Sequence, residues 1–190
     1  MAFVAERGYP VPVVHESGGT DLVMDRVDGP TMADTLGEAP WKVLWHARLL
    51  AKMQRRLARI EPPRWLLGDT LDTGRRESVV HLDLHPPNVI LSQRHGPVVV
   101  GWSDAAGGPA GFDAALSFVR ISTSEATTTA ETVARRVLSE SFRRIRGPGL
   151  MAPFLQIACE HRLGDPTITP DERMAVATLR AEIVSASSTR

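Results

Sequence analysis

The sequence predicts an α+β fold in which helices dominate. Two short runs near the start of the chain, residues 11–15 and 21–25, have strand character and flank a Glu-Ser-Gly-Gly turn. From residue 40 to 60, apolar residues recur at roughly 3.6-residue spacing, which indicates an amphipathic helix. Helical patterns also fill most of the second half, so strands form the minor part of the fold.

Local signals set the order of the elements. Residues 1–8 are expected to be the end of a helix that stops at Gly8. The helix over residues 40–60 should stop before Pro62 and Pro63, and its Trp and Met side chains are assigned to the core. We also expect helices at residues 30–34, 113–121, 128–146, 151–162 and 170–184, a strand at 89–91 and a frayed tail at 185–190.

Composition is that of a globular protein without net charge. The 190 residues include 22 Lys and Arg against 22 Asp and Glu, which leaves no electrostatic footprint for nucleic acid or an anionic membrane. Cys159 is the single cysteine, so no intramolecular disulfide can form, and its apolar neighbours predict a small buried side chain. No signal peptide or apolar run of about 18 residues appears. We therefore expect a cytoplasmic protein that binds neither nucleic acid nor a membrane.

Residues 81–91 give the strongest functional signal. They contain H-x-D-x-x-x-x-N, the spacing of the catalytic loop in kinase-like phosphotransferases. In that chemistry Asp83 would orient the acceptor hydroxyl and take its proton, and Asn88 would place an amide oxygen on Mg²⁺. The alternative is a plain turn before a strand. The apolar runs on both sides and the segment 96–104 favour the kinase-like interpretation.

Histidines 81 and 85 form an H-x-x-x-H pair, a spacing that aligns two metal ligands only on a helix. Pro86 and Pro87 predict a loop instead. We therefore expect His81 to orient the loop and His85 to pack against the prolines. His46 is expected in the core or at its rim, because no second histidine lies one turn away.

Taken with residues 99–104 and 108–113, the loop 81–91 makes the chain resemble the aminoglycoside phosphotransferase family, the small-molecule branch of the protein-kinase-like fold. The resemblance implies a mostly helical, kinase-like C-terminal lobe with a two-strand remnant of the N-terminal nucleotide lobe. Asp113 matches a structural Asp of the family. The implied division is residues 1–28 for the remnant and hinge, 29–184 for the helical lobe and 185–190 for the tail.

Segment 21–29 resembles the hinge of that family, which binds adenine through main-chain groups. The resemblance assigns an acceptor carbonyl to Asp25, a donor N–H to Val27 and the back of the adenine pocket to Met24. It implies ATP and Mg²⁺ as cofactors and a small-molecule hydroxyl as the acceptor. An ordinary edge strand ending in an Asp-Gly turn is the alternative for this segment.

Two departures from the family pattern weaken the expected chemistry. Gly101 stands thirteen residues after Asn88, where the family has the principal Mg²⁺ ligand, an Asp. Asp104 could replace it only through a local bulge, because three residues of strand span about 10 Å. At the front, no strands or phosphate-binding Lys precede residue 11, since Lys42 and Lys52 both fall in the predicted helix. We therefore expect an N-terminally truncated, degenerate member.

The sequence thus predicts an ATP-dependent O-phosphotransferase of small-molecule hydroxyls by family, with impaired or no activity in this chain. Two alternatives stay open: a pseudokinase-like protein that binds a small molecule or a partner, and a truncated gene product. A partner chain is expected to cover the exposed remnant sheet, whose apolar residues lie at positions 11–14 and 23.

Overall fold

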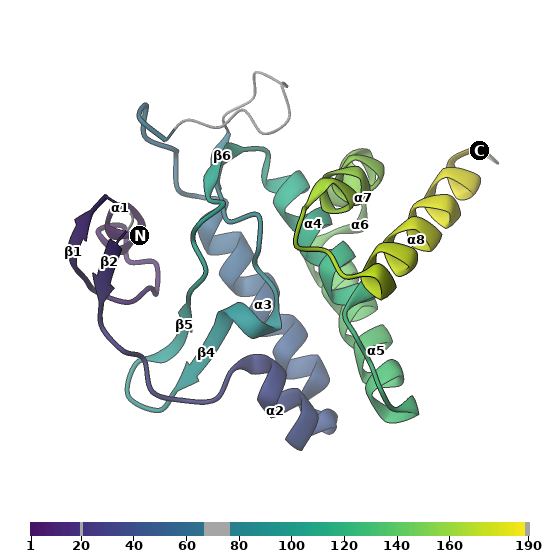
Figure 1. Cartoon of the computed structure of the whole chain (residues 1–190), viewed down its shortest axis with the longest axis horizontal. Helices are drawn as coiled ribbons and strands as arrows, with labels where there is room; N and C mark the ends of the chain where they lie inside the picture. Colours follow the sequence, from purple (N-terminus) through teal and green to yellow (C-terminus); the bar gives the residue numbers. More distant parts are fainter. Residues whose placement is uncertain (20, 67–76, 189–190) are drawn as a thin grey trace.

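The computed structural model describes residues 1–19, 21–66 and 77–188 and confirms a mostly helical α+β fold (Figure 1). The helices are α1 (Ala2–Ala5), α2 (Met32–Glu38), α3 (Val43–Leu57), α4 (Ala110–Thr123), α5 (Thr129–Arg146), α6 (Pro148–Met151), α7 (Leu155–Gly164) and α8 (Pro170–Ser188). The strands are β1 (Val14–Gly18), β2 (Asp21–Met24), β3 (Ser78–Val80), β4 (Val89–Ser92), β5 (Gly96–Val99) and β6 (Ala106–Gly108). No helix in these ranges is long and apolar enough to cross a membrane.

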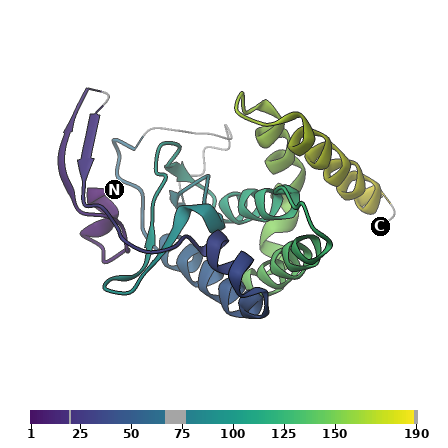
Figure 2. The ribbon, with the colours of Figure 1, turned by 60° about the horizontal axis from the view of Figure 1, so that its bottom comes forward.

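Helix α4 lies at the centre of the helical part of the fold. Its sequence is apolar nearly all round, and all but three of its residues are buried. It packs against α5, α6, α7 and α8, while α3 packs along α5 (Figures 1 and 2). A helix without a polar face can be stable only when neighbours surround it, so α4 is the element that organises the core.

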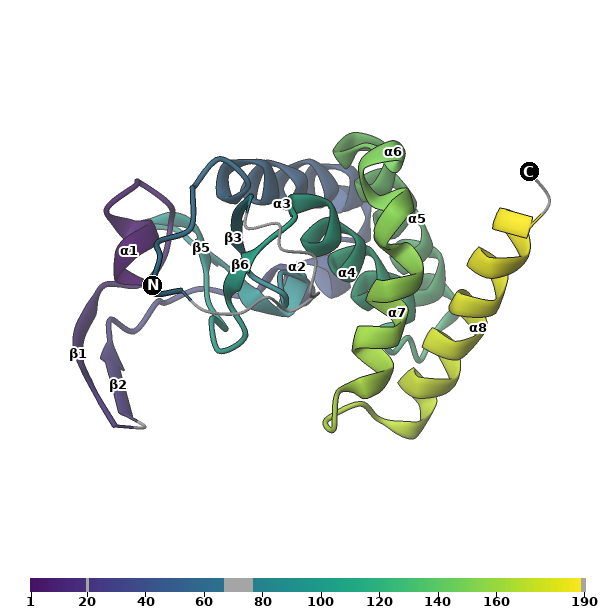
Figure 3. The ribbon, with the colours of Figure 1, turned by 90° about the horizontal axis from the view of Figure 1, so that it is seen from above.

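The described strands form three separate antiparallel pairs. They are β1 with β2, β3 with β6, and β4 with β5. The last two pairs flank the loop of residues 81–88, because β3 leads into it and β4 leaves it. The β1–β2 hairpin projects from one end of the molecule, and α8 lies at the opposite end (Figure 3).

A tight contact joins the hairpin segment to the body. Gly29 has φ +143°, and a Cβ there would lie 2.7 Å from the carbonyl oxygen of Leu91, so only glycine fits. The Leu91 N–H then donates to the carbonyl of Pro30, and α2 begins with a capping box between Thr31 and Asp34. This contact fixes α2 beside the loop of residues 81–88.

Three expectations about the elements are wrong. The predicted turn at 16–19 is part of β1, which continues to Gly18 and pairs it with Asp21, so the hairpin is tighter than expected. The single helix expected over 151–162 is broken, because Pro153 lies within a 3₁₀ turn, Ala152–Phe154, that separates α6 from α7. The tail expected from residue 185 is helical up to Ser188.

The core assignment of the Trp residues in the helix predicted over residues 40–60 is also wrong. Trp41 is 75% exposed and Trp45 is 51% exposed, whereas Met53 and Leu57 are buried as predicted. Trp41 lies before α3, in a 3₁₀ turn over Pro40–Lys42, and the first buried residue of α3 is His46. Periodicity locates the apolar stripe of a helix but not how much of its length the neighbouring elements cover.

Candidate functional site

The loop between β3 and β4 is held by a buried carboxylate. Leu82 has φ +64°, a conformation that is costly for a branched side chain. Asp113, at the start of α4, accepts hydrogen bonds from the N–H groups of His81 and Leu82, at 3.2 and 2.8 Å. Gln54 of α3 donates to the other carboxylate oxygen. Asp113 therefore fixes the strained turn that aims the next residue, Asp83, which agrees with the structural role expected for it.

His81 acts on the same turn from the other side. Its ring is buried against Trp102, and burial lowers its pKa to about 4, so the ring is neutral near pH 7. Its Nδ1 accepts the N–H of Asp83 at 3.2 Å, which leaves Nε2–H to donate to the carbonyl of Val100 at 3.0 Å. This is the orienting position predicted for His81.

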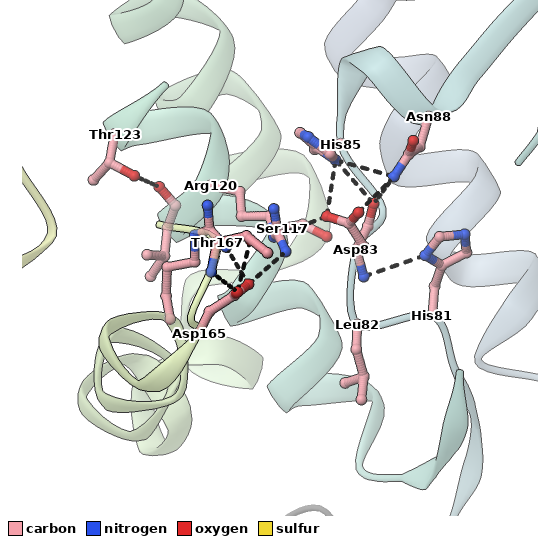
Figure 4. A network of polar contacts seen from close by, with 12 residues as sticks. His81, Leu82, Asp83, His85, Asn88, Ser117, Arg120, Thr123, Asp165 and Thr167 are labelled. Atoms are coloured by element: carbon pink, nitrogen blue, oxygen red, sulfur yellow. Dashed lines mark hydrogen bonds and ion pairs between the residues drawn. The ribbon is translucent and has the colours of Figure 1, made fainter. Parts of the chain in front are cut away.

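The Asp83 carboxylate is surrounded by three side chains (Figure 4). The Asn88 amide donates to its Oδ2 and to its main-chain carbonyl, both at 2.8 Å. The Nε of Arg120 on α4 lies 2.8 Å from Oδ1, and Nδ1 of His85 lies 3.2 Å from the same oxygen. The sequence analysis expected His85 only to pack against the prolines. Its Nδ1–H also donates to the carbonyl of Asp83 at 2.9 Å, so it is part of the site.

The contact between Arg120 and Asp83 is an ion pair rather than a hydrogen bond. The N–H of Arg120 Nε is not directed at the oxygen, so both Asp83 Oδ1 and Arg120 Nε are buried atoms without a hydrogen-bond partner. Burial lowers the pKa of the Arg120 guanidinium, although such a group stays protonated near pH 7. The site thus places a fixed positive charge directly beside the carboxylate.

Arg120 also connects Asp83 to the turn after α7. Its Nη2 lies 3.7 Å from Oδ2 of Asp165 (Figure 4). Asp165 also pairs with Arg162. Arg162 in turn binds Glu172 through two contacts of 2.7 and 2.5 Å. Charges from α4, α7 and α8 therefore converge on one side of Asp83.

The residues present do not fit the Mg²⁺ site that the kinase-like motif implies. Such a site needs carboxylate oxygens beside the amide oxygen of Asn88, and position 101 is glycine. A Cβ on Gly101 would lie 2.8 Å from Cγ and Nδ2 and 2.9 Å from Oδ1 of Asn88, so the amide fills the space beside this glycine. Asp104 is exposed and lies toward His161 of α7. Burial lowers the pKa of His161, and the negative charge of Asp104 partly offsets this. Among the described residues, no group of three or more His, Cys, Asp or Glu side chains could hold a metal.

The predicted adenine-binding residues lie on the projecting hairpin and the segment after it. Met24 ends β2 and is 42% exposed. The Asp25 N–H donates to Val13, and its carboxylate binds His15 at 2.6 Å. Val27 is half-buried. The hinge assignment of these three residues stays a prediction.

A cavity of about 610 Å³ opens beside Asp83 on the side away from the hairpin. Two of the side chains that touch Asp83, His85 and Arg120, form part of its wall. Apolar residues of α2, α4 and α5, among them Leu36, Ile121 and Leu138, form most of the rest. His85 and Arg120 thus connect the wall of this cavity to the Asp83 carboxylate.

The sequence analysis did not identify Arg120, Asp165 or Arg162 as part of the site. They lie far along the chain from the catalytic loop and reach it only through the packing of α4 and α7. The signal that could have pointed to Arg120 was an arginine near the end of an otherwise apolar helix pattern, where a charge must have a buried partner.

Comparison with known proteins identifies a family for the part of the chain that contains Asp83. A family model described as the phosphotransferase enzyme family matches residues 38–148, more than half of the chain. The match includes Asp83, Asn88 and Gly101 and leaves out the β1–β2 hairpin. None of the curated proteins compared matches the chain.

Proposed function

Because the chain belongs to the phosphotransferase enzyme family, we propose that it binds a small hydroxyl compound in the cavity beside Asp83 and that its phosphoryl transfer is strongly impaired. The family depends on ATP and Mg²⁺ in general. Asp83 stands where an acceptor hydroxyl would be oriented, and Asp113 and His81 hold it there.

The proposal depends mainly on Gly101. Phosphoryl transfer is accelerated by positioning and by stabilising charge on the phosphates, so the loss of a metal carboxylate costs orders of magnitude in rate. Asn88 is turned toward Asp83 and donates both of its short hydrogen bonds there. The metal side of the site is therefore weak, while the acceptor side keeps its carboxylate and its cavity.

Calorimetric titration with ATP, with and without Mg²⁺, tests this proposal on the purified chain and on Gly101→Asp. Asp tolerates positive φ better than most residues, so position 101, with φ +78°, can accept it once Asn88 rotates away. We expect Mg²⁺ to tighten ATP binding at least tenfold more in the variant than in the parent.

Gly96→Asp is the matched control. Gly96 also has positive φ, +69°, but nothing lies within 4 Å of a Cβ there, so this variant adds the same charge away from Asn88. Parent protein in which Mg²⁺ tightens ATP binding as strongly as in Gly101→Asp would contradict the proposal.

A second function, binding of a partner chain, is favoured by the hairpin. Leu22 and Val23 are 48% and 51% exposed on β2, which pairs only with β1 among the described residues, and Val13, directly before β1, is 57% exposed. Open strand edges with apolar side chains are sites of strand addition. A Val23→Lys variant that leaves the sedimentation coefficient and cell-extract complexes unchanged would argue against this function.

A further inference from the structure

We propose that the acceptor compound carries a carboxylate or phosphate group and that Arg120 binds this group. The inference rests on the proposed function, since it names the class of compound that would occupy the cavity beside Asp83. Its basis is the hydrogen-bonding state of one arginine and the charges around it.

Arg120 is half-buried, and its buried Nε has no hydrogen-bond partner. Its side chain is 14% exposed, and a guanidinium has five N–H donors in a planar fork. Among the described residues it makes ion pairs with Asp83 and Asp165 at 2.8 and 3.7 Å, but it donates no hydrogen bond, and its Nε is buried without a partner. Buried donors without partners are uncommon, because each costs about 1–3 kcal/mol.

A ligand in the cavity could bind the terminal nitrogens of the Arg120 guanidinium, since Nε is buried against Asp83. Arg120 is part of its wall, and the planar fork of arginine matches the two oxygens of a carboxylate or phosphate. A ligand that brings such oxygens would complete the hydrogen bonds that Asp165, at 3.7 Å, is too far away to accept.

The other charges on the wall favour an anion. Arg135 and Arg162 are also part of the wall, and Nη1 of Arg135 donates to the carbonyl of Ser124. The acidic wall residues are mostly engaged: Glu131 accepts the bonds that cap α5, and Glu172 binds Arg162. Glu125 is exposed at the rim, where solvent screens its charge.

The position of Arg120 also places the hydroxyl. Because its Nε is 2.8 Å from Asp83 Oδ1, an anionic group bound to the same guanidinium lies next to Asp83. A hydroxyl a few bonds from that group can then reach Asp83. The anion would compete with Asp83 for Arg120, so ligand binding would loosen the ion pair on the catalytic carboxylate.

Calorimetry with matched sugars tests the inference on the whole chain. Gluconate and sorbitol differ by a carboxylate in place of a CH₂OH group, glucose 6-phosphate supplies a phosphate, and glucosamine supplies a cation. We expect gluconate or glucose 6-phosphate to bind at least tenfold more tightly than sorbitol and glucosamine, and the tighter of the two identifies the anionic group.

Substitutions at Arg120 show whether that preference belongs to this residue. Arg120→Gln should abolish the preference for the anionic sugar, and Arg120→Lys, which keeps the charge but loses the fork, should keep part of it. Arg136→Gln, on the exposed face of α5, should change nothing. Thermal unfolding of each variant confirms that it is folded.

The possible failures separate this inference from the proposed function. Equal affinity for sorbitol and gluconate, or tightest binding of glucosamine, would overturn the anionic class while leaving a small-molecule site in place. Binding of none of the four sugars would overturn the inference as well. The titrations of Gly101→Asp with ATP and Mg²⁺ contain no acceptor compound. Their result therefore tests the proposed function whatever the sugars show.

Discussion

Asp113 adds to the stability of this protein a pH dependence that its replacement by Asn removes. The side chain is buried, and burial raises its pKa to about 6 despite the hydrogen bonds from His81 and Leu82 and the nearby charge of Arg146. The same carboxyl in the unfolded chain titrates near 3.8. Between these two values the folded protein binds more protons than the unfolded chain, so stability from this group falls as pH rises.

The magnitude follows from the two pKa values. At pH 7 both states are ionised and the contribution of Asp113 titration is close to zero, whereas at pH 4.5 the folded state is mostly protonated at this site. The difference is about 2 kcal/mol in favour of folding at the lower pH, since one pKa unit is worth about 1.4 kcal/mol. His81 acts in the opposite direction, because its lowered pKa of about 4 costs stability as pH falls below about 6.5.

Comparison of the parent with Asp113→Asn isolates the carboxyl, because the histidines are common to both proteins. Urea unfolding at pH 7 and pH 4.5 should show the variant losing about 2 kcal/mol relative to the parent on going to the lower pH. A stability difference that does not change between the two pH values, or that shrinks at pH 4.5, would refute the assignment of a raised pKa to Asp113.

Four further substitutions, one of them a control, test the packing around the site by the same unfolding measurement. Gly101→Ala should lower the free energy of unfolding by about 2–3 kcal/mol, because its Cβ would meet Asn88 at 2.8 Å. The control Gly96→Ala, whose Cβ would lie in open space, should lower it by only about 1–2 kcal/mol because of its positive φ. Equal losses would contradict the contact with Asn88. Gly111→Ala should lose more than either, about 3 kcal/mol or more, since a carbonyl oxygen lies 2.5 Å from its Cβ position. Thr128→Ala removes the cap of α5 and should cost about 1 kcal/mol, and no change would mean that the capping box is not formed.

Local sequence signals were sufficient for the loop and for most helices. The apolar residues after the H-x-D-x-x-x-x-N motif predicted a strand at 89–91, and β4 is there. Thr128 followed by Glu131 is a capping box that marks the start of α5 within one residue of the prediction. These features depend on neighbours in the chain, which a single sequence contains.

Features that depend on distant packing could not be predicted. The contact of Arg120 with Asp83 requires the angle at which α4 crosses the catalytic loop, and no local pattern encodes that angle. The exposure of Trp41 and Trp45 depends on which distant elements cover the start of α3, and no local pattern encodes that. Gly101 was recognised as a departure from the family pattern, but its close contact with Asn88 became visible only in three dimensions.

The division of the chain at residues 28 and 184 and the hinge role of Met24, Asp25 and Val27 stay predictions. The family match begins at residue 38 and therefore does not include the hairpin or the segment after it. Photoaffinity labelling with an azido-ATP would test the hinge directly, and we expect any labelled peptide to contain residues 21–29.

The most direct test of the account is the transfer of labelled γ-phosphate from ATP to the tightest-binding hydroxyl compound, measured for the parent, Gly101→Asp and Gly101→Asp with Asp83→Asn. We predict no transfer above background in the parent and measurable transfer in Gly101→Asp, which stays slow because this substitution does not supply a phosphate-binding Lys. Transfer should be lost when Asp83 is also replaced. Transfer by the parent at the rate of Gly101→Asp would contradict the central claim that Gly101 and the orientation of Asn88 impair this site.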